Sequence, residues 1–557
     1  MNNDTIVTDN HEIGSIFNNF FTSIGSDLSN ALPPSDVRFE TYLDSPCVRS
    51  FFFFQVTPSE CEKIISSLKN SKTDINSIPV SLFKRISPYI SGPLSNLINF
   101  SYEKGIFPKC LKISKVTPVF KSGDPLSTNN YRPISVFGFY TKIFEKCLVN
   151  RMLKYLTKFN LICPQQFGFL KGKSTFHAVN SIIEFIYDSF NRKQNCISIF
   201  LDLKKAFDTV NHSILLKKLE YYGFRCNSLK WFKSYLHDRQ QVVKIGNSLS
   251  NPSCIDIGVP QGSTLGPILF LIYINDIIKS SDKFNFSMFA DDTALSLKGK
   301  NPDQLIRIAN EELKNVSKWL LANRLTLNYN KTQWMFFTSS VKEYVFESDC
   351  IKIDNMVISR CFEFKYLGII LDSKLKFDKH IDYIGKKISR SIGIFYRLRN
   401  LIPIKGMLAL YYSLVYPYII YCILIWGNTY QTHLNKIILL QKRIIRIVNN
   451  ASYLAHTSIL FHQMRVLKFS DVFKFFLGKY AYEQNISNNL NFVSHDYPTS
   501  SSSNPVPQFQ RLTSTQRSLN YLAPVLFNQI DDSIKRVQST QVFKSRYKQF
   551  LLSDYIN

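Results

Sequence analysis

Two adjacent carboxylates interrupt an apolar stretch near the middle of the sequence. Asp291 and Asp292 lie within NFSMFADDTALSL, between runs rich in residues that favour β-strands. Neighbouring carboxylates are costly to bury unless a cation neutralises them. An Asp-Asp pair alone is weak evidence of a site, because most such pairs lie in solvated turns. The pair therefore indicates a functional site only if other acids lie close to it in the fold.

A third acid follows another apolar run, earlier in the chain. Asp202 ends the strand-like part of SIFLDLKKAFDTV. Three carboxylates that converge from two strands would hold two hard divalent cations, which prefer oxygen ligands. Two such metals activate an attacking hydroxyl and stabilise the leaving oxygen in phosphoryl transfer. This chemistry would explain why neighbouring acids are tolerated beside an apolar strand.

The elements around these acids mix short strands and helices in an irregular order. CISIFLDL and FNFSMFA have the pattern of strands, and HSILLKKLEYYGF that of a helix. This order favours an α+β fold over a doubly wound parallel sheet. From residue 375 to 480 the pattern becomes helical and basic, as in KIILLQKRIIRIV. That basic region is either a solvated helical face or a surface that follows phosphates.

The bulk composition points to a polyanionic partner. The 557 residues carry 68 Lys and Arg against 41 Asp and Glu, a formal net charge of +27. Nucleic acid is the simplest partner for such a surplus, and the length predicts about two to four domains. The eleven cysteines form no C-x-x-C pair and the N-terminus is polar. We therefore expect reduced thiols, no structural zinc and an intracellular protein.

Two segments resemble motifs that they do not complete. Residues 407–427 carry no charge over the length of a membrane span, but include five tyrosines and Pro417. We interpret them as a buried helix pair and expect no contact with a membrane. GFLKGKST (168–175) resembles a phosphate-binding P-loop but has three residues between Gly168 and the Gly-Lys pair. The P-loop motif requires four, so we do not expect a triphosphate loop of that kind.

Further motifs surround the three acids in a fixed order. They are VTPVFKSGDPLSTNNYRPISVFGFYTKIFEKCLVNRM (116–152), GVPQGSTLGPILFLIYINDI (258–277), WLLANRLTLNYNKTQ (319–333) and FKYLGIILD (364–372). The ordered set resembles the reverse transcriptase of non-LTR (LINE-type) retrotransposons, particularly jockey-like elements. The resemblance covers roughly residues 60–480, most of the chain.

The resemblance implies an α+β right-hand polymerase with fingers, an antiparallel-sheet palm and a helical thumb. The Ser/Pro-rich run YPTSSSSNPVP (497–507) is the clearest linker in the sequence. The expected divisions are a helical N-terminal extension leading into the fingers (1–95), fingers and palm (96–372), a basic helical thumb (373–490), and a linker with a C-terminal tail (491–557).

The resemblance also assigns catalytic roles. Asp202, Asp291 and Asp292 would be the catalytic acids of the palm and would bind two Mg²⁺ ions, which Mn²⁺ could replace. Lys331 matches the lysine proposed to protonate the leaving pyrophosphate, and a solvated lysine is its alternative reading. Phe207 matches the bulky gate that excludes a 2′-hydroxyl, and an ordinary core phenylalanine is the alternative there.

The remaining matches concern the incoming nucleotide. Gln261 and Gly262 match the motif that contacts the nucleotide and the template strand. Lys121 and Arg132 match the fingers residues that hold the triphosphate. We interpret Asp208 as the cap of the helix that follows it.

The implied activity is that of an RNA-directed DNA polymerase in target-primed cDNA synthesis. Its partners would be the element RNA as template, a DNA primer or target, and dNTPs, in a ribonucleoprotein of the nucleus and cytoplasm. Segment 168–175 would contact the template. Residues 1–95 are too short for the endonuclease of intact elements, so we expect DNA nicking in trans or its loss.

Three other readings remain open at this stage. An intron-encoded maturase would call for a dedicated intron-binding domain, which we do not identify. An RNA-dependent RNA polymerase usually has a small or polar residue at the sugar gate, and Phe207 argues against it. A catalytically inactive RNA-binding remnant of such an element would show a damaged acid triad, whereas all three acids are present here.

Overall fold

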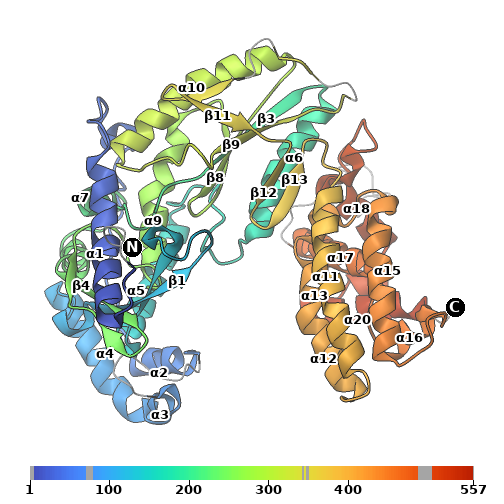
Figure 1. The fold of residues 1–557 in the computed structure, drawn as a ribbon, viewed down its shortest axis with the longest axis horizontal. Coiled ribbons are helices and arrows are strands. Elements are labelled where there is room, and N and C mark those ends of the chain that lie inside the picture. Colours follow the sequence, from blue (N-terminus) through green and yellow to red (C-terminus); the bar gives the residue numbers. More distant parts are fainter. Residues whose placement is uncertain (1–5, 70–78, 341–343, 347–349, 487–504, 556–557) are drawn as a thin grey trace.

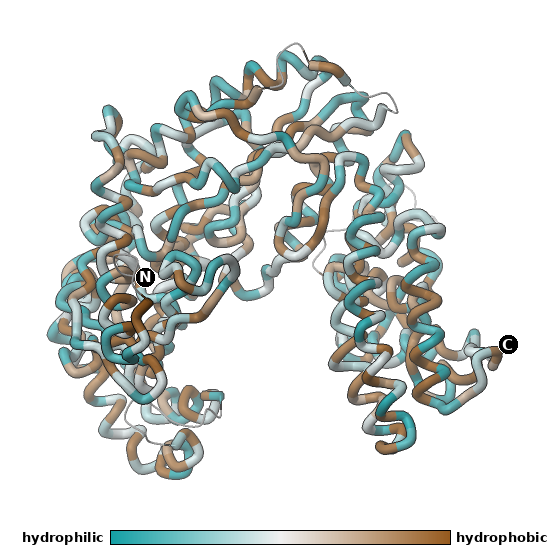
Figure 2. The backbone as a smooth tube through the Cα atoms, viewed as in Figure 1, coloured by the Kyte–Doolittle hydropathy of each residue, from teal (hydrophilic) through white to brown (hydrophobic). Residues whose placement is uncertain are grey.

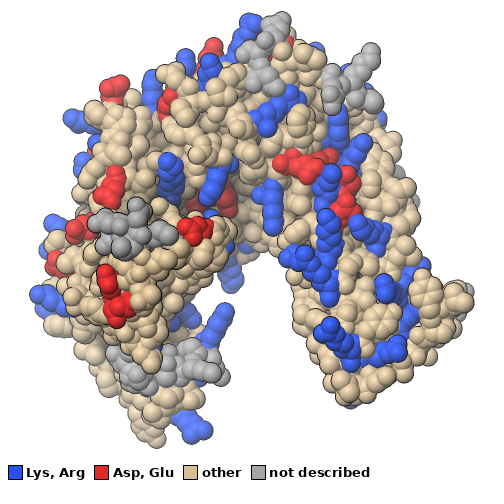
Figure 3. All heavy atoms as spheres, viewed as in Figure 1, with Lys and Arg blue, Asp and Glu red and all other residues tan. Residues whose placement is uncertain are grey.

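The chain forms an arch of two lobes, with the N-terminus in one lobe and the C-terminus in the other (Figure 1). The computed structural model describes residues 6–69, 79–340, 344–346, 350–486 and 505–555. A broad hollow separates the two lobes on the face seen in Figure 3. Most of the predicted linker 497–507 lies outside the described residues.

The first lobe combines helices with a small mixed sheet. Its strands run in the order β2-β1-β4-β5, and β6 pairs with β4. Helix α1 packs on β4, β5 and β6. The helices are α1 (Asn10–Asn30), α2 (Pro58–Ser66), α3 (Val80–Arg85), α4 (Ser87–Lys104), α5 (Phe139–Lys158), α7 (His212–Tyr221), α8 (Asn227–Leu236) and α9 (Gly266–Ile274). The strands are β1 (Ile113–Phe120), β2 (Tyr131–Val136), β4 (Arg239–Ile245), β5 (Ser248–Leu249) and β6 (Ser253–Ile255).

A six-stranded sheet lies at the centre of the arch. Its order is β10-β11-β9-β3-β8-β7, and the pairs of β3 with β8 and β9 are antiparallel. The helices α6 (Thr175–Asn191) and α10 (Pro302–Ala322) contact this sheet. The strands are β3 (Asn195–Leu201), β7 (Asn285–Phe289), β8 (Asp292–Gly299), β9 (Gln333–Phe337), β10 (Ile351–Ile353) and β11 (Met356–Arg360).

The two faces of this sheet belong to two different hydrophobic cores. Along β3, Ile197 and Ile199 pack into the core of the first lobe, whereas Cys196 and Phe200 pack into the core of the second. Successive side chains of a strand point to opposite faces, so an apolar run without alternation is what a sheet covered on both faces requires. The central sheet therefore joins the two lobes.

The second lobe is helical after a short β-hairpin. It contains β12 (Glu363–Tyr366), β13 (Ile369–Asp372), α11 (Asp378–Leu398), α12 (Ile404–Leu414), α13 (Tyr416–Ile420), α14 (Ile423–Trp426), α15 (Gln431–Val448), α16 (Thr457–Gln463), α17 (Phe469–Ile486), α18 (Leu519–Gln529), α19 (Asp532–Lys535) and α20 (Thr540–Ser553). The helices after residue 505 are part of its core. The Glu184 carboxylate of α6 accepts hydrogen bonds from the Ser518 hydroxyl at 2.6 Å and the Leu519 amide at 2.8 Å.

The predicted α+β class is confirmed by this mixture of sheets and helices.

The charge-free segment 407–427 forms parts of three short helices, α12 to α14, rather than the helix pair expected. Pro417 lies in the first turn of α13, where its missing N–H is tolerated. Helices of the second lobe carry polar as well as apolar residues (Figure 2). No helix in the described ranges is long and apolar enough to cross a membrane.

Candidate active site

Strand register brings the three predicted acids to one end of the central sheet. Leu201 of β3 pairs with Thr293 of β8, so the next residue, Asp202, lies beside the start of β8 at Asp292. Strands β7 and β8 form a hairpin whose last pair is Phe289 with Asp292. Asp291 is therefore in the two-residue turn between them.

That turn has an unusual backbone. Ala290, the residue before Asp291, has φ +59°. A left-handed conformation is common in two-residue hairpin turns, but a residue with a Cβ adopts it only where its surroundings hold it. The Ala290 amide donates a hydrogen bond to the Oε1 atom of Gln166 at 3.0 Å.

Asp202 is oriented by a residue that the sequence analysis did not identify. The Asn328 side chain donates from Nδ2 to Asp202 Oδ2 at 2.7 Å. The backbone of Asn328 also donates to the Asp202 carbonyl at 2.8 Å, and the Asp202 amide donates to Thr332 Oγ1 at 3.2 Å. Asn328 and Thr332 lie in the same NYNKT segment as Lys331, and their amide and hydroxyl side chains are the ones that reach Asp202.

Burial and neighbouring carboxylates raise the pKa values of Asp291 and Asp292. Burial raises the pKa of Asp291, and the neighbouring Asp202 raises it further. Burial likewise raises the pKa of Asp292 to about 6, with Asp291 and Asp202 adding to the effect. Lys121 and Arg132 act in the opposite direction on both groups. A bound cation would relieve this repulsion.

Four cations lie within electrostatic reach of one another beside these acids. Burial lowers the pKa of Lys121, and the charges of Lys331 and Arg132 lower it further. Burial also lowers the pKa of Lys205, which the sequence analysis did not single out, and Lys121, Arg132 and Lys331 add to that shift. Like charges held together in this way favour a polyanionic ligand between them.

Phe207 is half-buried and belongs to a row of aromatic rings. Its ring stacks on Phe270 with centroids 4.6 Å apart and meets the ring of Phe169 edge-on at 6.5 Å. Its carbonyl accepts a hydrogen bond from the Val259 amide at 2.8 Å. Phe207 therefore contacts the core, as in the simpler reading, and also adjoins the loop that carries Gln261.

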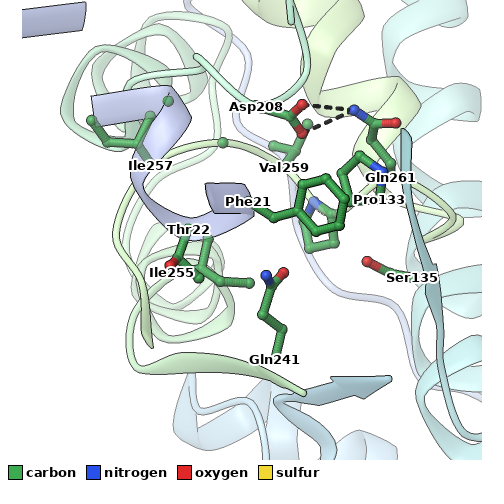
Figure 4. Close-up of a pocket in the computed structure, with 13 residues that line it drawn as sticks. Phe21, Thr22, Pro133, Ser135, Asp208, Gln241, Ile255, Ile257, Val259 and Gln261 are labelled. Atoms are coloured by element: carbon green, nitrogen blue, oxygen red, sulfur yellow. Dashed lines mark hydrogen bonds between the residues drawn. The ribbon is translucent and has the colours of Figure 1, made fainter. Parts of the chain in front are cut away.

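The Gln261 side chain is held by Asp208. Its Nε2 atom donates to both carboxylate oxygens of Asp208, each at 2.9 Å (Figure 4). The prediction that Asp208 caps the following helix is wrong, because Asn211 caps α7 by accepting from the Ile214 amide at 3.1 Å. The carboxylate of Asp208 instead accepts hydrogen bonds from the Gln261 side chain. Burial raises the pKa of Asp208 to about 6.

Helix α1 contributes to the same neighbourhood. Phe21, Thr22 and Gly25 line one pocket together with Asp208 and Gln261 (Figure 4). A Cβ at Gly25 would lie 2.1 Å from the Asp208 carbonyl oxygen. The N-terminal helix therefore packs directly against the segment that carries Phe207 and Asp208.

Gly262 lies at a close approach between two loops. Its φ is +113°, and a Cβ there would lie 2.4 Å from the Ser135 carbonyl oxygen. The Ser135 amide in turn donates to the Gln261 carbonyl at 2.7 Å. Only glycine combines this backbone conformation with the available space.

The donor set suits a hard divalent cation. In the described part of the chain, no group of three or more His, Cys, Asp or Glu side chains is already arranged to hold a metal ion. Mg²⁺ is usually bound by one or two carboxylates, with waters and substrate phosphates completing its coordination. Three aspartates on adjacent strands, without sulfur or imidazole, fit that pattern better than a zinc site.

Comparison with known proteins gives the class of this domain. Residues 119–371 match the family of reverse transcriptases (RNA-dependent DNA polymerases). This segment includes β3, β7 and β8 and all nine predicted site residues, from Lys121 to Lys331. This segment is therefore similar to a reverse transcriptase domain.

Three relatives are named as RNA-directed DNA polymerases of Drosophila mobile elements. The chain is 28% identical over 432 residues to a probable RNA-directed DNA polymerase from transposon BS of Drosophila melanogaster, covering 74% of this chain and 47% of that protein. It is 27% identical over 464 residues to the RNA-directed DNA polymerase from mobile element jockey of the same species (81% and 50%). The Drosophila funebris jockey protein is 28% identical over 439 residues (76% and 47%).

These findings confirm the predicted resemblance: residues 119–371 match the reverse transcriptase family, and the chain is similar to RNA-directed DNA polymerases of the jockey and BS elements. The chain spans about half the length of the curated relatives it matches.

Proposed function

We propose that this chain is an RNA-directed DNA polymerase that joins a primer 3′-hydroxyl to the α-phosphate of a dNTP and releases pyrophosphate. The observation that carries the proposal is the register of β3 and β8, which sets Asp202 beside Asp291 and Asp292. The names of the jockey and BS relatives support the same activity.

The three aspartates would hold two Mg²⁺ ions, which Mn²⁺ could replace. When bound, such a metal pair activates the attacking hydroxyl and stabilises the leaving oxygen. Asn328 keeps the Asp202 carboxylate in one orientation through its 2.7 Å hydrogen bond. The raised pKa values of Asp291 and Asp292 describe the acids without a cation and would fall once one binds.

The neighbouring cations would bind the triphosphate. Lys121 and Arg132 would offset its negative charge, and Lys331, which lies within electrostatic reach of Lys121, would give a proton to the departing pyrophosphate. All three side chains influence the pKa of Lys205, which places a fourth positive charge beside them.

The sugar and base would contact the loops that follow Asp202. Phe207 presents its ring as the gate against a 2′-hydroxyl, supported from behind by Phe270. Gln261 and Gly262 would contact the nucleotide and the template strand. Because Gln261 donates to Asp208 through Nε2, the oxygen end of its carboxamide would be the end that faces a ligand.

The lobes would correspond to the parts of a right-hand polymerase. The first lobe supplies fingers, the central sheet forms the palm, and the helices from α11 onward form the thumb. The broad hollow between the lobes (Figure 3) would take the duplex of element RNA and DNA primer. Basic helices would contact the backbone of this duplex without reading its sequence, and the cDNA synthesis would be target-primed. A location in both nucleus and cytoplasm stays a prediction.

Primer extension tests the proposal. The purified chain is given an RNA template with an annealed DNA primer, dNTPs and Mg²⁺, with Asp291→Asn alongside. Product from the wild type alone is the expected result. Tight template binding without product from either protein would instead favour a catalytically inactive RNA-binding remnant. Product on a DNA template but not on RNA would contradict the RNA-directed assignment.

A further inference from the structure

The loop over residues 165–173 lies directly against the hairpin that carries Asp291. The Met288 amide donates to the Gln165 carbonyl at 3.0 Å, and the Phe167 amide donates to the Met288 carbonyl at 2.8 Å. Gln166 and Met288 thereby form an isolated parallel bridge. The loop is fixed to β7 one residue before that strand ends.

Gln166 makes the contact that reaches the turn itself. The residue is 1% exposed, and its Oε1 atom accepts from the Gly168 amide at 2.8 Å and the Ala290 amide at 3.0 Å. Ala290 is the residue in the left-handed conformation beside Asp291. A single carboxamide oxygen therefore holds both the loop and the strained residue of the turn.

Gly168 allows this close packing. A Cβ at this position would lie 2.5 Å from the Ala290 nitrogen and 3.1 Å from the Phe289 carbonyl carbon. Lys173 closes the loop by donating from Nζ to the carbonyls of Pro164 and Gln166, each at 2.8 Å. The glycine and lysine that resemble a P-loop therefore serve contacts within this region.

The same loop also reaches the proposed sugar gate. Phe169 is 47% exposed, has φ +55°, and meets Phe207 edge-on. The loop thus touches both the turn that carries Asp291 and the ring that would face the sugar.

We propose that Gln166 is a positioning residue: it holds the turn at Ala290 and so sets where Asp291 stands relative to Asp202. The inference rests on the proposed function for its catalytic consequence, but the hydrogen bond that carries it can be tested without catalysis. A positioning residue acts through the carboxylates and touches no substrate, so its removal should weaken metal binding without weakening template binding.

Gln166→Met tests this role, because methionine keeps the length of the side chain and lacks the acceptor. Gln166→Glu keeps an acceptor oxygen and should restore the bond. Gln441→Met is the matched control: Gln441 is also 1% exposed, and its Oε1 accepts from the Phe469 amide at 2.8 Å in the second lobe. Both methionine variants lose a buried carboxamide, but only one loses a contact to the turn.

Two measurements are made on the full chain without substrate. Hydrogen–deuterium exchange follows the peptide 286–292, and electron paramagnetic resonance follows the binding of Mn²⁺. Gln166→Met should exchange roughly tenfold faster in that peptide, the change expected from losing one buried hydrogen bond. It should also bind Mn²⁺ roughly tenfold more weakly, because loss of a residue that supports a metal ligand weakens metal binding by about that factor. Gln441→Met should change neither.

The outcomes separate this inference from the proposed function. Unchanged exchange in Gln166→Met would overturn it, as would faster exchange with unchanged affinity for Mn²⁺. Equal changes in Gln441→Met would also overturn it, because they would mark general destabilisation. If the wild type makes no DNA, the proposed polymerase activity fails, whereas the exchange and Mn²⁺ comparisons still decide the role of Gln166.

Discussion

The end of the central sheet and the basic face of the second lobe organise charge in opposite ways. At the sheet, Asp202 and Gln261 each have a particular side-chain partner, Asn328 and Asp208 respectively. In the second lobe, α11 and α15 pack through buried isoleucines such as Ile388 and Ile444. Their cations remain at the surface, where few distances are fixed. One region depends on geometry and the other on the number of charges.

Figure 3 shows many Lys and Arg side chains over the second lobe, and Figure 1 places α11 on its side toward the hollow. Lys386, Arg390 and Arg397 of α11 are exposed. We propose that these side chains contact phosphates, and such contacts supply affinity that is independent of sequence and sensitive to salt. Loss of one charged side chain should therefore reduce activity severely at the end of the central sheet, and should weaken template–primer binding only mildly on α11.

The largest effect is expected for Asp291→Asn. The amide keeps the size of the side chain but lacks the charge that binds a cation. Primer extension should fall by roughly 10³-fold or more, as for other groups that act as a catalytic unit. The affinity for template–primer, measured by fluorescence anisotropy, should stay within about twofold, because no phosphate contact is lost.

Asp282→Asn is the matched control for that substitution. Asp282 is exposed and lies just before β7, in the same region of the chain. It should retain full activity. If both aspartates reduced activity equally, or if Asp291→Asn lost binding and activity together, the assignment of Asp291 as a metal ligand would be wrong.

A smaller effect is expected for Phe207→Ala. Removal of the ring should admit the 2′-hydroxyl and reduce the preference for dNTPs over rNTPs by roughly 10–100-fold, the range for steric discrimination in a pocket. The ratio of kcat/KM for dGTP and GTP measures it. Phe207→Tyr keeps the ring and serves as the control, and unchanged discrimination in the alanine variant would leave Phe207 as a core residue only.

The three acids could be singled out from the sequence because motifs and periodicity are local. Apolar runs identified β3 and β7, and the helical spacing of KIILLQKRIIRIV identified α15. Thr57 caps α2 just before Pro58, with its side chain accepting from the Glu60 amide. Each of these features depends on residues a few positions apart, which hydrogen bonds and side-chain direction link directly.

The supporting contacts could not be predicted, because they join distant parts of the chain. Gln166 and Ala290 are 124 residues apart, and Asn328 and Asp202 are 126 apart. The fold alone brings such pairs together. The same holds for Glu184 with Ser518, which ties the helices after residue 505 to α6. The predicted role of Asp208 is wrong for the same reason: a helix cap is a local feature, whereas its partner Gln261 lies 53 residues away on another loop.

The pH dependence of the free energy of unfolding tests the electrostatic effect of burying Asp208. Burial raises the pKa of its carboxyl from 3.8 to about 6. A raised pKa means that the folded protein binds this proton more tightly than the unfolded chain, so the wild type loses stability as the pH rises between these two values. Relative to Asp208→Asn, the free energy of unfolding of the wild type should fall by on the order of 2 kcal/mol from pH 4 to pH 7.

Urea denaturation of both proteins at several pH values measures this difference. The comparison cancels the titration of all other groups, and the bond that Gln261 makes to the neutral carboxamide of Asp208→Asn does not depend on pH. A difference that does not vary with pH would show that Asp208 titrates normally, and the electrostatic account of its burial would be wrong.

The smallest single effects are expected on α11. Lys386→Gln, Arg390→Gln and Arg397→Gln should each weaken template–primer binding only a few-fold, and each should reduce the slope of log affinity against log salt by about 1 if the side chain neutralises one phosphate. The triple variant should lose the sum, because exposed charges act almost independently. Binding titrations at several salt concentrations give the slope, and kcat at saturating template–primer should not change.

Lys314→Gln and Lys318→Gln provide the control, since both residues are exposed on α10, at the outer side of the arch (Figure 1). They lower the net charge in the same way and should leave the slope unchanged. Equal losses from α10 and α11 would mean that only total charge matters. A single arginine that carried the whole effect would instead show that the second lobe, like the sheet, holds its ligand through fixed geometry.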